Sequence, residues 1–253
     1  MRNTTNYAYI LKGKVNSMNT INTKYLEVTE PVNVSPKYRF VSTAEFVQDV
    51  EAQGFKLTKL QGRSPKGTGK HLMVFERDDL KLLNGDKIQL LAYTSHDGTS
   101  SFKLFLGYYR LVCSNGLMVG TTLEEYRVTH VGYAAQKVQR AIYNCLQSVE
   151  QLKRQVQDAH ISRLGILDQT RIASIVAAEV GASCALDLVT SHRGADNEDT
   201  AWNVMNRIQE NVIQGNFGRK DAEGRLTKAR RVTGAASLVK LNRFIWDTVL
   251  KAA

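Results

Sequence analysis

Two sets of residues in this chain have types and spacings that could do chemistry. The first is Cys113 in the stretch "VCSNG", which could act as a thiolate if the imidazole of His130 served as its base. A cysteine buried in a strand and a structural histidine explain the same residues, and we favour this interpretation. The second set is a run of cations between Asn216 and Arg243, where eight basic residues stand against two acids. Charge is therefore a stronger signal than covalent catalysis.

The basic run also has backbone freedom, since glycines lie within and beside it. Such a segment can follow a sugar-phosphate chain, with salt-dependent contacts from Arg and Lys and a stacking surface from Phe217. This pattern predicts contact with nucleic acid, and the alternative is a solvated loop whose charge neutralises acids elsewhere in an oligomer. The residues predicted to bind phosphates are Arg219, Lys220, Arg225, Lys228, Arg230 and Arg231.

A second cationic loop, "QGRSPKGTGKH", covers residues 61–71. The phosphate-cradling loop of nucleoside triphosphatases needs a glycine, four spacers and then Gly-Lys-Ser/Thr at the start of a helix. Here Ser64 stands at the glycine position, His71 follows the lysine, and a strand pattern comes next. We instead predict a flexible cationic finger whose Lys66 and Lys70 touch phosphates; an ordinary solvated hairpin loop is the alternative.

Other catalytic or metal-binding patterns are weak. No two of the five histidines have a ligand spacing such as HxH or HxxxH. The cysteines Cys113, Cys145 and Cys184 are odd in number and form no CxxC pair, which argues against a disulfide framework and a zinc ribbon. We therefore expect no catalytic set, no metal and no cofactor.

The elements that must position these residues follow from hydrophobic periodicity. Between residues 55 and 132, short apolar runs with period two alternate with turn-formers, which predicts an antiparallel sheet of four to six strands. Within it, Asn115-Gly116 is typical of a two-residue hairpin turn, because both residues must take positive φ. Cys113 is then next to a turn, without any sign of chemistry of its own.

Helical spacing dominates elsewhere. Residues 43–53 form a predicted helix capped by Ser42 or Thr43, and apolar residues from Val138 to Val156 at spacings of 4, 3, 4, 3 and 4 predict one long amphipathic helix. Further helices are predicted at 168–188, 198–214 and 235–252, with the basic run as the linker before the last. The fold class is α+β: an antiparallel sheet packed with a long helix, then a helical C-terminal half.

The chain is expected to have a flexible N-terminal arm at residues 1–35 and a single α+β domain at 36–253. Residues 36–132 of that domain are mainly sheet and 133–253 mainly helical. No apolar run reaches about 18 residues and no secretory signal is present, so we expect a cytoplasmic protein without a membrane partner.

Two separated motifs resemble a family of phage- and plasmid-encoded proteins of unknown function. The first has an Arg-x-Val-Cys-Ser-Asn-Gly core and the second joins a Trp-x-x-x-Asn-x-x-Gln-Glu-Asn helix to a glycine, a basic stretch and an Asn-Arg-x-x-Trp helix. The matching residues are Arg110, Val112, Cys113, Asn115, Gly116, Trp202, Asn206, Gln209, Glu210, Asn211, Gly215, Asn242, Arg243 and Trp246. The resemblance implies a mobile element in a bacterial cytoplasm, and a fold-level analogy points to phage single-strand annealing proteins.

The motif helix has an apolar face around Trp202 and polar side chains at other positions. We expect Asn206, Glu210 and Asn211 to form a buried polar network that locks this helix to the "VCSNG" hairpin. A binding site lined by Asn206, Glu210, Arg110 and Asn115 is the alternative.

The function expected from all of this is sequence-nonspecific binding or annealing of single-stranded DNA in replication or recombination, by a homo-oligomer without enzyme activity. The alternatives are a host-takeover or anti-defence protein that binds a bacterial protein, and an enzyme that uses Cys113.

Overall fold

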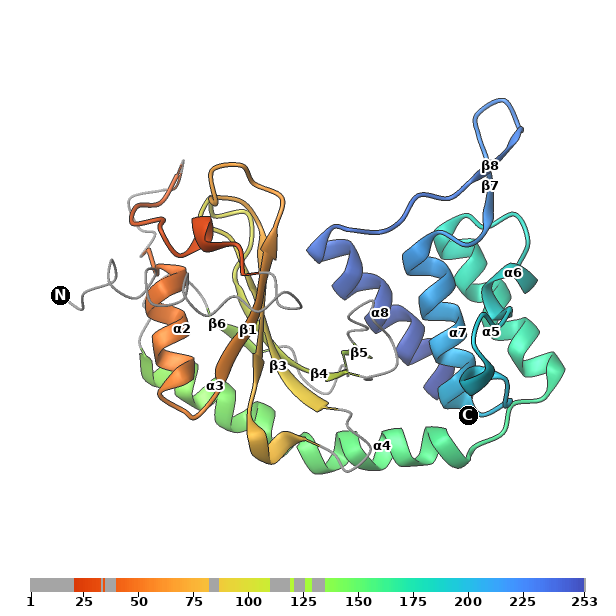
Figure 1. The fold of residues 1–253 in the computed structure, drawn as a ribbon, viewed down its shortest axis with the longest axis horizontal. Helices are drawn as coiled ribbons and strands as arrows, with labels where there is room; N and C mark the ends of the chain where they lie inside the picture. Colours follow the sequence, from red (N-terminus) through yellow and green to blue (C-terminus); the bar gives the residue numbers. More distant parts are fainter. Residues whose placement is uncertain are drawn as a thin grey trace. The chain divides into compact units, whose positions relative to one another are not determined.

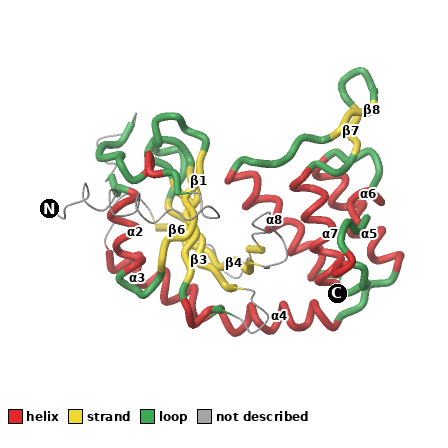
Figure 2. The backbone as a smooth tube through the Cα atoms, viewed as in Figure 1, coloured by secondary structure: helices red, strands yellow, loops and turns green. Residues whose placement is uncertain are grey.

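The structure is a computed structural model that describes residues 21–32, 34, 40–81, 87–109, 119–120, 126–128 and 135–252. Its contacts gather in two compact units. Unit 1 comprises Met1–Leu111 and Leu123–Val149, and unit 2 comprises Val112–Thr122 and Glu150–Ala253. A cluster of contacts is not by itself an independently folding domain, so the single domain expected over 36–253 stays a prediction. The α+β class is confirmed (Figures 1 and 2).

Unit 1 is built on an antiparallel sheet, as the alternating pattern predicts. Its strands are β1 (Lys56–Gly62), β2 (His71–Glu76), β3 (Lys87–Thr94), β4 (Phe102–Tyr109) and β6 (Tyr126–Val128). The two-residue strand β5 (Val119–Gly120) is counted with unit 2. Strands β1 to β4 pair in sequence order and β6 pairs with β4. The pairing register shifts once, between Leu57 and Lys59 in β1. The crest at residues 110–118, with the predicted Asn115-Gly116 turn, lies outside the described residues.

Helices of unit 1 pack on this sheet through an aromatic cluster. Helix α2 (Thr43–Glu51) begins at a complete capping box, in which the Ser42 hydroxyl accepts from the Glu45 N–H and the Glu45 carboxylate accepts from the Ser42 N–H. Phe46 of α2 stacks on Phe102 of β4 with ring centroids 4.8 Å apart. The short 3₁₀ helices of this unit are η1 (Thr23–Tyr25) and η2 (Asp78–Leu80).

Part of the predicted N-terminal arm is packed. The N–H of Asn22 donates to the carbonyl of Leu60 at 2.9 Å, and Tyr25 and Leu26 are buried. Burial of the large side chains at positions 25 and 26 stabilises the packing of this stretch. Residues 1–20 lie outside the described residues.

The prediction of a single long helix around residues 138–156 is wrong in one respect. The structure has α3 (Ala135–Gln147) and α4 (Val149–Ile161) with a turn at Ser148, whose N–H donates to the carbonyl of Cys145 at 3.1 Å. The seam itself is confirmed, because all six of its residues are buried: Val138, Ile142, Cys145, Val149, Leu152 and Val156. The apolar periodicity of the seam continues across the turn at Ser148, so the periodicity did not indicate that the helix is divided there.

Unit 2 is organised around helix α7. After α4, its elements are α5 (Ile166–Val180), α6 (Leu186–Val189), η3 (Gly194–Asp196), α7 (Ala201–Gln214), β7 (Gly218–Lys220), β8 (Leu226–Lys228) and α8 (Ala235–Leu250). Helix α7 contacts α5, α6 and α8, and Trp202 of α7 and Trp246 of α8 are buried. The predicted helices 198–214 and 235–252 are confirmed with shorter ends.

The helix predicted over 168–188 is two helices. Gly181 takes φ +70° and caps α5 in the left-handed conformation, and its N–H donates to the carbonyl of Ala177. The chain resumes helical structure only at Leu186. A glycine just past a helix end is a strong stop signal, and the apolar residues beyond it hid the break.

Candidate nucleic-acid interface

The basic run is a β-hairpin, which corrects the prediction of a linker. Strands β7 and β8 pair antiparallel, with Arg219 opposite Thr227 and Lys220 opposite Leu226. The turn "DAEG" closes it, because the Asp221 carboxylate accepts from the backbone N–H groups of Glu223 at 3.0 Å and Arg225 at 2.8 Å. Within unit 2 the hairpin projects beyond the helices (Figure 1).

Five of the six predicted phosphate-binding residues are exposed cations without a carboxylate partner among the described residues. Within the described part of the chain, no carboxylate pairs with these five exposed side chains: Arg219, Lys220, Lys228, Arg230 and Arg231. They fall within thirteen consecutive residues, 219–231. Charges packed this closely and left uncompensated attract a polyanion.

Arg225, the sixth predicted residue, is engaged by its own turn. Its guanidinium lies 2.9 Å from a carboxylate oxygen of Asp221 and 2.9 Å from one of Glu223. The backbone N–H of Arg225, followed by its guanidinium, holds the pKa of Asp221 below its ordinary value, so this carboxylate stays charged at neutral pH. Arg225 therefore shapes the turn and offers less free charge than its neighbours.

The base of the hairpin is fixed by close backbone packing. The N–H of Ala229 donates to the carbonyl of Phe217 at 2.9 Å, and the N–H of Val232 to that of Ile213 at 2.8 Å. Gly215 ends α7 with φ +72°, and a Cβ there would lie 2.5 Å from the carbonyl oxygen of Ala229. Glycine is therefore required where the basic strand crosses the end of the motif helix.

Arg219 is also positioned by its surroundings. A Cβ on Gly181 would lie 3.1 Å from its Nη2 atom, so the guanidinium rests against the C-terminus of α5. A helix C-terminus carries partial negative charge and favours a cation. The hydroxyl of Ser183 donates to the carbonyl of Gly218 at 2.9 Å and ties the same helix end to β7.

Lys66 and Lys70 belong to unit 1 and are both exposed. Their loop has internal hydrogen bonds: the Ser64 hydroxyl accepts from the N–H of Thr68 at 3.2 Å, and the Tyr25 hydroxyl accepts from the N–H of Ser64 at 2.9 Å. The hairpin cations are in unit 2, so the two predicted groups belong to different units.

A buried chain of polar groups adjoins this loop at Gly69. Thr43 Oγ1 is 2.8 Å from Nε2 of His71 and 2.8 Å from Nε2 of His96, and Nδ1 of His71 is 3.0 Å from the carbonyl oxygen of Gly69. A carbonyl only accepts, so His71 donates from Nδ1 and its Nε2 accepts the Thr43 proton, while His96 donates from Nε2. Burial, with the charge of His96 second, lowers the pKa of His71 to about 3.

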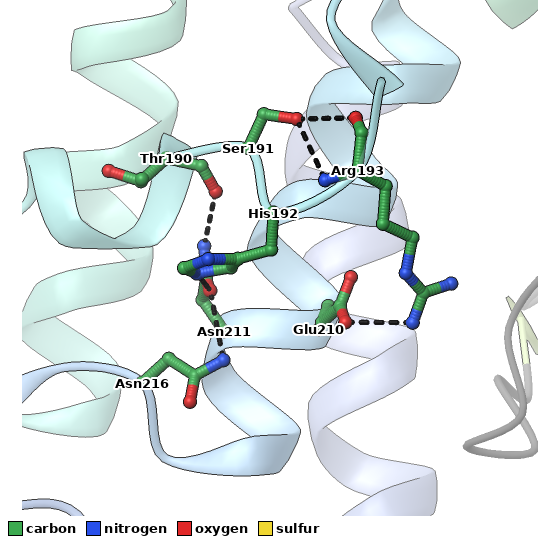
Figure 3. A network of polar contacts seen from close by, with 7 residues as sticks. All are labelled: Thr190, Ser191, His192, Arg193, Glu210, Asn211 and Asn216. Atoms are coloured by element: carbon green, nitrogen blue, oxygen red, sulfur yellow. Dashed lines mark hydrogen bonds and ion pairs between the residues drawn. The ribbon is translucent and has the colours of Figure 1, made fainter. Parts of the chain in front are cut away.

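The motif helix carries a network of polar contacts; its predicted link to the "VCSNG" hairpin falls outside the described residues. Asn211 is fully buried; its amide donates to the carbonyls of Leu188 and Thr190, and its oxygen lies 2.8 Å from Nε2 of His192 (Figure 3). Glu210 pairs with Arg193 at 2.7 Å. The network thus holds α7 to the segment that follows α6.

Asn206 and Trp202 lie in the interior of unit 2. The Asn206 amide donates to the Trp202 carbonyl at 2.7 Å, and both residues are almost fully buried. The alternative site would pair Asn206 and Glu210 with Arg110 and Asn115. The last two lie outside the described residues, as do Gly116, Cys113 and His130, so neither the link to the hairpin crest nor a role for Cys113 is tested.

His192 and Arg193 were missed by sequence reasoning. They stand 17 to 19 residues before their partners and share no short-range spacing with them. The only signal was a pair of side chains on the motif helix, Glu210 and Asn211, whose polarity required partners of some kind.

Other chemistry is limited in the described residues. Cys145 is buried and Cys184 is exposed, both as free thiols. Across the described ranges, no three His, Cys, Asp or Glu residues gather as a metal site. None of the helices in these ranges combines the length and the apolar character needed to cross a bilayer.

Comparisons with known proteins show a family without an assigned activity. The family model of DUF932, a domain of unknown function, matches residues 32–246. Two proteins of Escherichia coli (strain K12) are similar over 224 residues, which cover 84% of this chain and 81% of each relative: UPF0380 protein YfjQ at 28% identity and UPF0380 protein YafZ at 26%. No solved structure matches. Because the family model covers most of the chain, including the hairpin and the motif helix, this protein belongs to the DUF932 family.

Proposed function

We propose that this protein binds single-stranded nucleic acid through phosphate contacts of the β7–β8 hairpin, without reading base sequence. Five exposed cations without carboxylate partners among the described residues carry the proposal. A two-stranded hairpin that projects from its unit can lie along a sugar-phosphate chain, and the conformable backbone of a single strand can follow such a surface.

The biological setting that we propose is DNA replication or recombination by a phage or plasmid, with strand binding or annealing as the activity. The sequence motifs motivate this setting. We further propose that the protein acts as a homo-oligomer. Ile161, Ile166 and Leu167 support this, since each is more than two-thirds exposed and apolar surface of this kind is typical of contact sites.

Salt dependence gives the sharpest test. If the five free cations each engage one phosphate of a single strand, a plot of log binding constant against log salt concentration should have a slope of about −3.5. Replacing Arg230 and Arg231 by Ala should reduce the slope to about −2.1 and weaken binding equally for all sequences. The measurement is fluorescence anisotropy of labelled oligonucleotides, single-stranded and double-stranded, at several salt concentrations.

A matched control removes the same amount of positive charge from another part of unit 2. The Lys153→Ala/Arg171→Ala variant removes two cations of the same unit that already pair with Glu150 and Asp168. It should leave affinity and slope unchanged. If both double variants weaken binding alike, net charge and not the hairpin is responsible, and the assignment fails.

A second candidate is binding of a bacterial host protein with an acidic surface. Leu226 favours it, because this leucine is 70% exposed between the hairpin cations and an apolar anchor amid charge suits a protein interface. Absence of oligonucleotide binding at low salt, together with a complex from host lysate that survives nuclease treatment and is lost in Leu226→Ser, would favour this function.

A further inference from the structure

The base of the hairpin borders an open pocket of about 340 Å³ that no prediction from the sequence included. Its walls come from the end of α5, the residues around β7, the segment after β8 and the first turns of α8, all in unit 2. The volume is at the lower end of the range for ligand sites in proteins. The pocket therefore suits a ligand of about the size of one nucleotide.

Part of the pocket lining is apolar, and we call its four residues from α5, α7, the residue before β7 and α8 the apolar floor: Val180, Val212, Phe217 and Leu241. Phe217 is 7% exposed and thus presents only a small part of its ring. A flat ring system without charge is the ligand part that such a floor favours.

The pocket lining also includes three cations. Arg219, Arg230 and Lys240 line the pocket, and one carboxylate, that of Glu179, faces them. This carboxylate is paired with Lys240 at 2.7 Å. Neither arginine has a carboxylate partner among the described residues, so two positive charges remain for an anion next to the apolar floor.

We propose that this pocket holds one unstacked base of a single strand, with the adjoining phosphates on Arg219 and Arg230. The inference rests on the proposed function, because the same two arginines belong to the hairpin surface that follows the strand. It adds a reason for preferring single strands: a base inside a duplex is paired and stacked and cannot enter without being flipped out. The apolar floor offers no pattern of donors and acceptors, so every base can enter.

A variant that fills the pocket tests this without changing charge. Ser237 is exposed and lines the pocket from the first turn of α8, so Ser237→Trp should fold and block entry; Ser237→Ala is the matched control. A base stacked on a protein surface contributes on the order of 1–3 kcal/mol. We expect affinity for oligothymidylate to fall about tenfold in Ser237→Trp, with an unchanged salt slope and no change in Ser237→Ala.

A second variant and a second ligand keep the test decisive. Leu241→Ala removes part of the floor and should lower oligothymidylate affinity about threefold, again at constant slope. An oligomer of abasic deoxyribose phosphate should bind wild type and both variants equally, since it has no base to insert.

The possible failures differ from one another. If Ser237→Trp and Leu241→Ala bind oligothymidylate as wild type does, while Arg230→Ala/Arg231→Ala still weakens binding, the pocket inference is overturned and the proposed function stands. If wild type binds no oligonucleotide, both are overturned. Binding of thymidine monophosphate that Ser237→Trp abolishes, without binding of the oligomer, would assign the pocket to a free nucleotide and overturn the polynucleotide form.

Discussion

At the scale of single residues, Gly215 has the strictest requirement in the candidate interface. Its positive φ costs any other residue about 1–2 kcal/mol, and a Cβ would also meet the Ala229 carbonyl. Gly224 at the tip of the hairpin provides the comparison, because its φ is +77° and nothing lies within 4 Å of its would-be Cβ.

Gly215→Ala should therefore lower the free energy of unfolding of unit 2 by about 1–3 kcal/mol more than Gly224→Ala does, the difference being the steric term. Urea unfolding followed by tryptophan fluorescence measures it. Equal losses in the two variants would show that the backbone at Ala229 can move aside.

His71 makes the stability of unit 1 depend on pH. Its folded pKa of about 3 lies below the unfolded value of about 6.5, so the unfolded chain binds more protons between these values and stability falls as pH falls through that window. A proton on Nε2 would also face the Thr43 hydroxyl, which already accepts from His96.

We expect a loss of about 2 kcal/mol between pH 6.5 and 5.0, measured by urea unfolding with far-UV circular dichroism. His71→Gln cannot titrate and should flatten this part of the pH profile, although its stability at pH 7.5 is lower. A variant profile as steep as that of wild type would assign the pH dependence to other groups.

At the scale of elements, helix α7 depends on one amide. Asn211→Ala would leave the carbonyl of buried Leu188 and the part-buried carbonyl of Thr190 without their donor, and a buried unsatisfied group costs about 1–3 kcal/mol. We expect a loss of about 2–4 kcal/mol in the fluorescence-detected unfolding of unit 2. Asn216→Ala, which removes only a 3.4 Å contact to the same side chain, should cost under 1 kcal/mol.

Elements with strong periodicity could be predicted from the sequence, and elements set by a few residues could not. Strands β2 to β4 are apolar runs of six to eight residues between turn-formers, and Ser42 as a capping residue indicates the start of α2. Strands β7 and β8 have three residues each, half of them charged, so they resemble a linker. Their place beside α7 depends on backbone contacts between Gly215 and Ala229, which a sequence does not show.

The candidate site was predictable to the same degree. The cations could be found from composition alone, because their density in 219–231 is high. The pairing of Arg225 depends on the conformation of its own turn, and the pocket beside Arg219 depends on how the hairpin packs against α5 and α8, so neither could be predicted from composition. The density of cations could thus be predicted from the sequence, whereas the geometry that positions them could not.

At the scale of the whole molecule, the two units should be separable by spectroscopy. Both tryptophans of the chain, Trp202 and Trp246, are buried in unit 2, whereas helices and strands of both units contribute to circular dichroism. Tryptophan fluorescence should therefore follow the unfolding of unit 2 alone.

We expect Gly215→Ala to shift the fluorescence transition and only part of the dichroism transition, and a change from pH 7.5 to 5.0 to shift mainly the remaining part. Coincident transitions under every condition would instead show one cooperative domain over 36–253.

The exposed thiol of Cys184 makes the hairpin accessible to labelling. It follows Ser183, whose N–H and hydroxyl both donate to the carbonyl of Gly218, so a maleimide dye attached there reports from beside the first residue of β7. Cys145 is buried and should react slowly, and replacing Cys113 by Ser removes the third thiol. The chain thus carries its own attachment point for measuring energy transfer to a dye on a bound strand.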